Sequence, residues 1–124
     1  MEGAAICAHI AKYDQSIGTF IGVNWALGSA VIEHCGSDEQ KERLLPGCLN
    51  FSKITAFALT EPKYGSDATS MESFAVRATD GRDGWILNGE KRWIGNATMA
   101  DYIVVWAKNR DDKNKVQGFV LERG

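Results

Sequence analysis

The spacing of apolar residues changes near residue 52, and this change divides the chain into two regions. Before it, apolar positions recur every three or four residues, as on one face of a helix. After it, short runs rich in β-branched and aromatic residues are separated by turn-forming residues, as in a sheet. The pattern predicts an α+β chain with a helical segment over residues 1–52 and a β segment over residues 53–124.

The helical region opens with a short alanine- and isoleucine-rich helix over Ala4–Lys12. A longer helix is expected from Ser16, whose side chain can cap it, to about Cys35. Glycines weaken a helix by roughly 1 kcal/mol each, so their presence indicates that something packs closely against this one. They are Gly18, Gly22 and Gly28.

A third helix is expected after Gly36. Ser37 and Gln40 have the spacing of a capping box, and Asp38 and Glu39 suit the positive end of a helix dipole. Because proline lacks a backbone N–H, Pro46 is expected to stop this helix.

Strands are predicted in the second region at residues 54–60, 75–79, 84–94, 101–108 and 116–122. Asn88-Gly89 is the strongest local signal, because this pair accepts the positive φ values of a type I′ turn. Residues 84–88 and 90–94 are therefore expected to form a tight hairpin with Trp85 opposite Arg92. Residues 110–115 are expected to form a polar loop.

Composition excludes several classes of function. The 124 residues carry a net charge of −2 without a long block of either sign, so we expect no nucleic-acid partner. No apolar run approaches about 18 residues, and no signal-peptide pattern is visible, so we expect no membrane span. The cysteines form no C-x-x-C pair and are not spaced with the histidines as zinc ligands, so no metal site is expected; these residues are Cys7, Cys35, Cys48, His9 and His34.

The stretch TEPKYGSD directly follows the first predicted strand. Pro62 cannot donate to a ladder, and Gly65 lets another body approach the backbone. Ser66 and Asp67 can bind local backbone or an incoming ligand. Two interpretations stay open, a capped surface turn and a ligand-binding loop.

The stretch KRWIGNA offers a second cluster of useful side chains. Trp93 is a large apolar plate, Gly95 permits close approach, and Asn96 carries both donors and acceptors. The commoner alternative is a core tryptophan followed by a turn.

Taken in order along the chain, these motifs resemble the acyl-CoA dehydrogenase and acyl-CoA oxidase family of flavoproteins. The resemblance covers nearly the whole chain from about residue 10 onward. It rests on CGSDEQKERLLP, AFALTEPKYGSD (56–67), GWILNGEKRWIGNATMAD (84–101) and YIVVWAK followed by GFVLERG. It implies a fragment of such a protein: the end of an N-terminal helical domain (1–52), followed by part of an antiparallel β-barrel domain that contacts the flavin (53–124).

The resemblance implies FAD as cofactor and an acyl-CoA thioester as substrate, with Ser66 as the substrate contact. It places these residues at the cofactor: Phe57, Ala58, Leu59, Thr60, Gly65, Ser66, Trp93, Ile94 and Gly95. Oriented N–H groups and hydroxyls can stabilise charge on a reduced flavin, and an aromatic wall excludes water.

In the family, a base removes the α-proton of the acyl-CoA while the β-hydrogen leaves as hydride, which gives a 2,3-enoyl-CoA. That base is a glutamate of a C-terminal helical domain with no counterpart here, so no catalytic residue is assigned among Glu39, Glu42, Glu61 and Asp67. The alternative is a catalytically inactive, truncated product that lacks the base domain.

Finer features of the resemblance point to different branches. The WIGN form is similar to short-chain acyl-CoA oxidases, whereas SMES and the closing segments are similar to glutaryl-CoA dehydrogenases, so an electron-transfer flavoprotein and oxygen both stay open as acceptor. Glutaryl-CoA dehydrogenases have an arginine where Gly18 falls, which favours a short or medium acyl chain here. Relatives imply a homotetramer in the mitochondrial matrix, the peroxisome or the bacterial cytoplasm.

Overall fold

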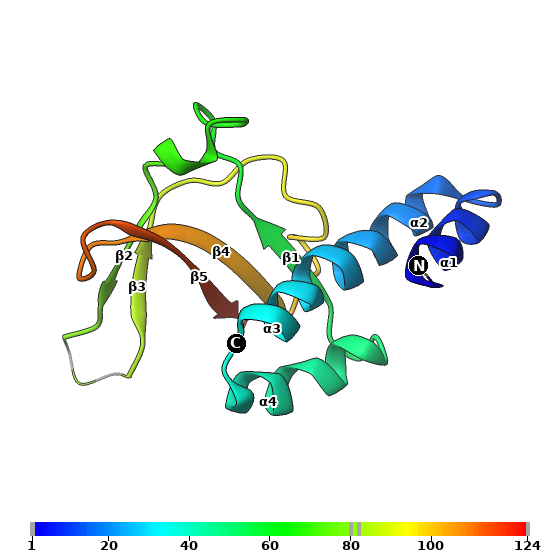
Figure 1. Ribbon diagram of the computed structural model, residues 1–124, viewed down its shortest axis with the longest axis horizontal. Coiled ribbons are helices and arrows are strands. Elements are labelled where there is room, and N and C mark those ends of the chain that lie inside the picture. Colours follow the sequence, from blue (N-terminus) through cyan, green and yellow to red (C-terminus); the bar gives the residue numbers. More distant parts are fainter. Residues whose placement is uncertain (1, 80, 82, 124) are drawn as a thin grey trace. The chain divides into compact units, whose positions relative to one another are not determined.

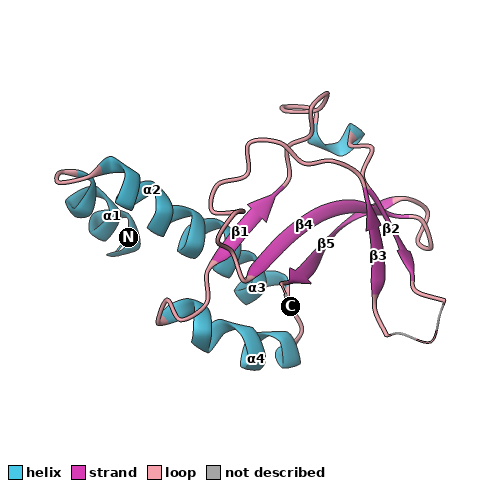
Figure 2. Ribbon diagram, turned by 180° about the vertical axis from the view of Figure 1, so that it is seen from behind, coloured by secondary structure: helices cyan, strands magenta, loops and turns pink. Residues whose placement is uncertain are grey.

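The computed structural model describes residues 2–79, 81 and 83–123. The chain folds as two compact units, each of which brings together separated parts of the sequence. The first comprises Met1–Phe57, Gly95–Val104 and Glu122–Gly124, and the second comprises Ala58–Ile94 and Val105–Leu121. The α-helices lie in the blue-to-green part of the chain and the strands in the green-to-red part, as the sequence pattern predicts (Figure 1). Figure 2 shows the same elements by type, with the short 3-10 helix Ala68–Ser70 among the strands.

The first unit begins with the helices α1 (Glu2–Ala11) and α2 (Gln15–Gly22). They approach closely at Gly18, where an added Cβ would lie 3.3 Å from Cβ of Ala11. The prediction that Ser16 caps the second helix is wrong, since Asp14 is the N-cap. Its carboxylate accepts from the Ser16 backbone N at 2.7 Å and from Ser16 Oγ at 2.6 Å, so Ser16 is used as a donor.

The long helix predicted to end near Cys35 is continuous but not uniform. A π-helix, Val23–Ser29, joins α2 to α3 (Ala30–Cys35). Here the Asn24 carbonyl accepts from Ser29 Oγ at 2.7 Å and from Thr55 Oγ1 at 2.8 Å. These two hydroxyls give the carbonyl of a π-helical residue side-chain hydrogen bonds, one from within the π-helix and one from the strand β1 (Thr55–Ala58).

Helix α4 (Asp38–Leu49) has the expected capping box, in which Ser37 Oγ accepts from Gln40 N and Gln40 Oε1 accepts from Ser37 N. The prediction that Pro46 ends it is wrong, because the helix continues to Leu49. Leu44 and Cys48 are completely buried on either side of the proline. Their packing holds the last turn despite the hydrogen bond that Pro46 cannot make.

The strands are β1 (Thr55–Ala58), β2 (Phe74–Arg77), β3 (Trp85–Asn88), β4 (Tyr102–Asn109) and β5 (Lys115–Glu122). In the sheet β2 pairs antiparallel with β3 and parallel with β4, while β1 and β5 each pair with β4. The sheet is therefore mixed, and the order of helices followed by strands agrees with the end of a helical domain and part of a β domain, as the resemblance implies. The irregular residues 89–101 separate β3 from β4, so β4 is not forced to return beside β3 as a hairpin strand would.

The hairpin predicted around Asn88-Gly89 is wrong. Residues 90–94 form no strand, and Trp85 pairs with Arg77 of β2 instead of Arg92. Gly89 has φ +141°, and Asn88 is not among the residues with positive φ, so no type I′ turn forms. A Cβ at Gly89 would lie 2.6 Å from Cβ of Ser73. Gly89 thus permits a close approach of two segments and does not reverse the chain.

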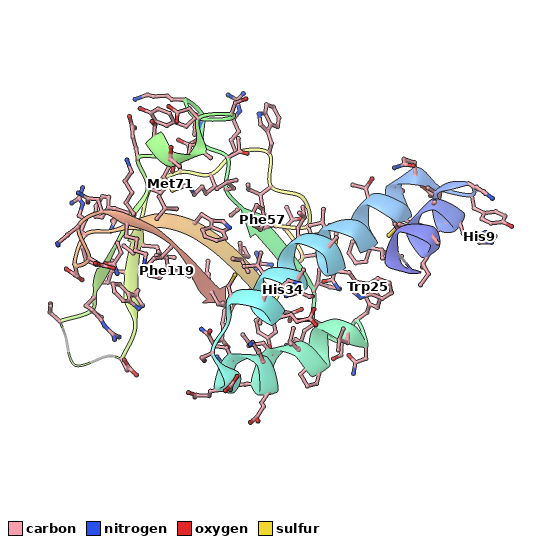
Figure 3. All side chains as sticks on the ribbon, in the orientation of Figure 1. His9, Trp25, His34, Phe57, Met71 and Phe119 are labelled. Atoms are coloured by element: carbon pink, nitrogen blue, oxygen red, sulfur yellow. The ribbon has the colours of Figure 1, made fainter. Side chains whose placement is uncertain are left out.

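Each unit has its own buried side chains. In the second, Ala75, Ala107 and Phe119 form a cluster against which Trp85 and Leu87 pack. The rings of Trp85 and Phe119 meet edge to face at 5.1 Å (Figure 3 labels Phe119). Within the described ranges, no helix has the length and apolar character needed to cross a membrane.

Candidate functional site

Two hydrogen bonds to backbone carbonyls join the predicted ligand-contacting stretches within the second unit. Arg92 N donates to the Thr60 carbonyl at 2.8 Å, and Lys91 Nζ donates to the Leu59 carbonyl at 2.9 Å. TEPKYGSD and KRWIGNA, about thirty residues apart in sequence, are therefore joined where β1 ends. Of the predicted site residues, those from Ala58 to Ile94 belong to this unit, while Phe57 and Gly95 belong to the first.

TEPKYGSD contains a tight turn that leaves its second half accessible. Glu61 and Tyr64 close the turn with reciprocal backbone hydrogen bonds of 3.1 and 3.3 Å. Thr60 is half-buried, whereas Gly65 and Ser66 are exposed. No described heavy atom lies within 4 Å of a Cβ added at Gly65. The capped-turn interpretation is correct in geometry, and the same turn presents an open backbone at Gly65–Ser66.

Trp93 is not a core residue, which removes the commoner alternative for KRWIGNA. It is 80% exposed and has a left-handed φ of +61°. The guanidinium of Arg92 lies 4.4 Å from its ring centroid. A large aromatic residue at positive φ is uncommon and costs of the order of 1–3 kcal/mol, which is typical of binding sites. The chain thus presents an exposed aromatic ring directly after Arg92, whose backbone N–H bonds the Thr60 carbonyl.

Gly95 and Asn96 continue this segment into the first unit. Asn96, also at positive φ (+63°), donates through Nδ2 to the carbonyls of Phe20 and Thr55 at 3.2 and 3.3 Å. A Cβ at Gly95 would lie 3.2 Å from Val23 Cγ2. The donors of Asn96 are therefore used to anchor the backbone.

The least expected feature of the site is a buried ion pair. Lys91 Nζ lies 2.9 Å from Glu61 Oε1, and their side chains are only 10% and 4% exposed. The Glu61 carboxylate also accepts from the backbone N–H groups of Glu72 at 2.6 Å and Ser73 at 2.9 Å.

Burial alone would raise the pKa of Glu61, because it removes the charged form from water. Interactions with Ser73, with the Lys91 ammonium and with the two backbone N–H groups outweigh that effect and lower the pKa to about 2. Glu61 is thus a permanently charged anchor near neutral pH. Such a pKa does not suit a general base, for which a value near the operating pH is optimal.

The sequence places Glu61 in the TEPKYGSD stretch and carries no signal that links it to Lys91. The two are 30 positions apart, and the hairpin predicted over residues 84–94 would have placed Lys91 beside residues 84–88 and not beside Glu61. The one sequence feature that could have indicated a charged partner is the position of Glu61 directly after a predicted strand, because a buried charge without a partner is costly.

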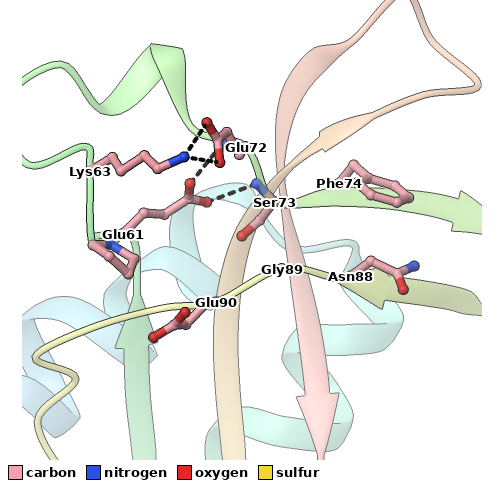
Figure 4. Close-up of a pocket in the computed structure, with 9 residues that line it drawn as sticks. Glu61, Lys63, Glu72, Ser73, Phe74, Asn88, Gly89 and Glu90 are labelled. Atoms are coloured by element: carbon pink, nitrogen blue, oxygen red, sulfur yellow. Dashed lines mark hydrogen bonds and ion pairs between the residues drawn. The ribbon is translucent and has the colours of Figure 1, made fainter.

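A cavity of about 360 Å³ is lined in part by Glu61 (Figure 4). Its lining includes Glu72, Ser73 and Gly89, and the exposed Lys63–Glu72 ion pair of 3.3 Å lies at its edge. None of the predicted cofactor-contacting residues lines it. Across residues 2–79, 81 and 83–123, no group of three or more His, Cys, Asp or Glu side chains could hold a metal ion.

Two family models match the chain. The model of the acyl-CoA dehydrogenase N-terminal domain matches residues 1–52, and that of the acyl-CoA dehydrogenase middle domain matches residues 56–124.

Similar proteins agree with these matches. A probable acyl-CoA dehydrogenase of Bacillus subtilis is 41% identical over 90% of this chain, and the mitochondrial very long-chain specific acyl-CoA dehydrogenase of Bos taurus is 38% identical over 92%. The chain covers 18% of the length of each of these relatives. A glutaryl-CoA dehydrogenase from Mycobacterium smegmatis in complex with FADH2 matches with a TM-score of 0.81 and 36% identity, over 94% of this chain and 28% of its own.

Proposed function

This chain belongs to the acyl-CoA dehydrogenase family, and from this premise we propose that it forms one wall of a site for FAD and an acyl-CoA thioester. The reaction is the α,β-dehydrogenation of the acyl group to the 2,3-enoyl-CoA. Residues 1–52 would act as the end of the helical domain and residues 53–124 as part of the flavin-contacting domain. The positions of the two family matches, 1–52 and 56–124, support this division.

The observation that carries the proposal is the hydrogen bond from Arg92 N to the Thr60 carbonyl, at 2.8 Å. It joins the two stretches that the family resemblance assigns to the flavin. The similarity to a structure solved with FADH2 makes FAD the appropriate cofactor. The proposed contacts are Phe57, Ala58, Leu59, Thr60, Gly65, Ser66, Trp93, Ile94 and Gly95.

The side chains present fit an aromatic, charge-accepting cofactor. The 80% exposed Trp93 offers a flat surface that would exclude water from one side of a bound ring system. The Thr60 hydroxyl can donate to a ring atom, and the open backbone at Gly65–Ser66 leaves room for the acyl chain, which Ser66 would contact. FAD, when bound, supplies the acceptor for the hydrogen that leaves the β-carbon.

A simple short or medium acyl chain is the proposed substrate. Gly18 lies where the resemblance to glutaryl-CoA dehydrogenases would place an arginine. It is buried and faces α1, with Cβ of Ala11 3.3 Å from the position of an added Cβ. Without a cation there, the distal carboxylate of a dicarboxylyl-CoA would have no partner at this position.

FAD titration, followed by flavin absorbance and by the Kd, tests the proposal. Trp93→Ala should weaken binding about two- to tenfold, since an aromatic contact contributes about 0.5–1.5 kcal/mol. Thr60→Ala should weaken it by a similar factor through one lost hydrogen bond. Tyr13→Ala, which removes an 84% exposed aromatic residue outside the proposed site, should leave the Kd unchanged.

Two results would contradict the proposal. The unsubstituted protein could retain no flavin band after desalting. Alternatively, it could bind FAD with an affinity that neither Trp93→Ala nor Thr60→Ala changes relative to Tyr13→Ala.

A further inference from the structure

We infer that Glu61 and Lys91 are positioning residues that hold the two flavin-contacting stretches in register. This inference rests on the proposed function and deepens it. Neither side chain is among the proposed cofactor contacts. Their role would be to fix Leu59–Thr60 against Trp93–Ile94.

Lys91 joins the two stretches from one side. Its ammonium has three donors, and its acceptors include the Leu59 carbonyl at 2.9 Å and Glu61 Oε1 at 2.9 Å. Met71 Sδ lies at 3.8 Å. Because these partners surround a side chain that is only 10% exposed, the ammonium is held in one place.

Glu61 joins a third segment from the other side. Its two carboxylate oxygens accept from Glu72 N and Ser73 N, the residues that lead into β2 (Figure 4). Through one carboxylate and one ammonium, the end of β1, the start of β2 and the segment after β3 are tied at a single point.

The neighbouring backbone shows what this tie positions. Arg92, directly after Lys91, donates its N–H to the Thr60 carbonyl, directly before Glu61. The ion pair thus joins Glu61, the residue after Thr60, to Lys91, two residues before Trp93. The hydrogen bond joins Thr60 itself to Arg92, the residue before Trp93. A displacement of the Lys91 side chain would move both proposed contacts, and sites of this kind lose much of their function when a contact shifts by about 1 Å.

An exposed ion pair, between Lys63 of the same turn and Glu72, provides a matched control. Lys63 and Glu72 also form a lysine–glutamate pair, at 3.3 Å, but their side chains are 71% and 60% exposed. Lys63→Met and Glu72→Gln remove the same charges as Lys91→Met and Glu61→Gln. Unlike the buried pair, Lys63 donates to no backbone carbonyl in the described contacts.

The experiment measures the Kd for FAD, the shape of the visible flavin band and the thermal unfolding midpoint in these variants. Binding is measured at a temperature at which circular dichroism shows each variant to be folded. Lys91→Met should raise the Kd at least about tenfold and change the flavin band, a loss typical of residues that orient direct ligands. The two control variants should stay within about twofold of the unsubstituted protein.

Lys91→Arg separates positioning from stability. Arginine keeps the charge and can donate to both Leu59 O and Glu61, so it should recover most of the affinity that Lys91→Met loses. If Lys91→Met does not fold, the Kd of Glu61→Gln tests the inference instead. Glutamine is expected to disturb folding less, since it keeps one oxygen that can accept from a backbone N–H.

The outcomes distinguish this inference from the function on which it rests. Folded Lys91→Met or Glu61→Gln protein with a Kd within about twofold of the controls and an unchanged flavin band would overturn the inference, even if its unfolding midpoint were lower. Failure of the unsubstituted protein to bind FAD would overturn the proposed function itself, and the inference with it.

Discussion

A single glycine fixes how closely the π-helix packs on β1 in the first unit. A Cβ at Gly28 would overlap Thr55 Oγ1 and lie 2.5 Å from Thr55 Cβ, both well inside normal contact. Thr55 cannot move away, because it is fully buried and its hydroxyl donates to the Asn24 carbonyl. The absence of a side chain at Gly28 is therefore a condition for this contact.

Gly28→Ala should lower the free energy of unfolding by about 1–3 kcal/mol, because overpacking outweighs the better helix propensity of alanine. Gly22→Ala is the matched control in the same long helix, since no described atom lies within 4 Å of its added Cβ. It should raise the free energy of unfolding by up to about 1 kcal/mol. Urea denaturation compares the two, and equal effects of the same sign would refute the packing argument.

The glycines also show what sequence can reveal at the scale of one residue. Their presence in a helix predicted close packing, and Gly18 and Gly28 confirm it. Gly22 does not, because it faces no described atom within 4 Å. Composition shows that a helix carries glycines, but the contact at each position depends on which chain segment crosses there.

At the scale of the element, the π-helix depends on one buried amide. Asn24 is completely buried; its Oδ1 accepts from Thr55 N at 2.7 Å and its Nδ2 donates to the Cys48 carbonyl at 3.2 Å. It thus connects the π-helix to β1 and to the last turn of α4, beyond Pro46. This connection gives a second reason why α4 continues past its proline.

Asn24→Ala should destabilise the protein by about 2–4 kcal/mol, because it leaves a buried N–H and a buried carbonyl without partners. Asn50→Ala provides the comparison, since Asn50 Oδ1 accepts from Ser52 N at 2.9 Å on the exposed surface. That variant should lose no more than about 1 kcal/mol in urea denaturation. A loss of similar size in both variants would show that the buried amide has no special role.

Local signals predicted elements well, and long-range contacts decided where the predictions failed. The Ser37 capping box was readable because both partners lie within one helical turn. The prediction that Pro46 ends a helix failed because the buried packing of Leu44 and Cys48 holds the helix beyond it. The hairpin predicted at Asn88-Gly89 failed because Ser73 packs closely against Gly89. For the candidate site, the sequence singled out both motifs, TEPKYGSD and KRWIGNA. It did not show their connection through Glu61 and Lys91, since that connection joins residues that no local pattern links.

At the scale of the whole molecule, both units contain carboxylates whose pKa is lowered in the folded protein, so folding favours their charged form. In the first, the Ile54 backbone N–H and Lys53 lower the pKa of Asp101, and Arg43 lowers the pKa of Glu122 through a two-bond contact of 2.7 Å each. In the second, the pKa of Glu61 falls to about 2. Acid should therefore weaken both units.

The direction and range of this effect follow from the pKa of Glu61. Its folded value of about 2 lies below its ordinary value of 4.5, so its contribution is fully present above about pH 5 and is lost as the pH falls toward 2. That contribution is on the order of 3 kcal/mol for a side chain this deeply buried. The exposed Arg43–Glu122 pair should add a smaller part that high salt screens, whereas the buried Glu61–Lys91 pair should respond little to salt.

Urea denaturation at a series of pH values, in low salt and in 1 M salt, measures this prediction. The unsubstituted protein should hold a constant free energy of unfolding from about pH 8 to 5 and lose several kcal/mol between pH 5 and 2. Glu61→Gln should begin less stable at neutral pH but lose less on acidification, because its amide takes up no proton in this range. If the free energy of unfolding of Glu61→Gln falls as steeply with acid as that of the unsubstituted protein, the acid sensitivity arises elsewhere, in exposed carboxylates such as Glu122. High salt would then reduce the acid-dependent loss, because salt screens an exposed ion pair and leaves a buried one nearly unchanged.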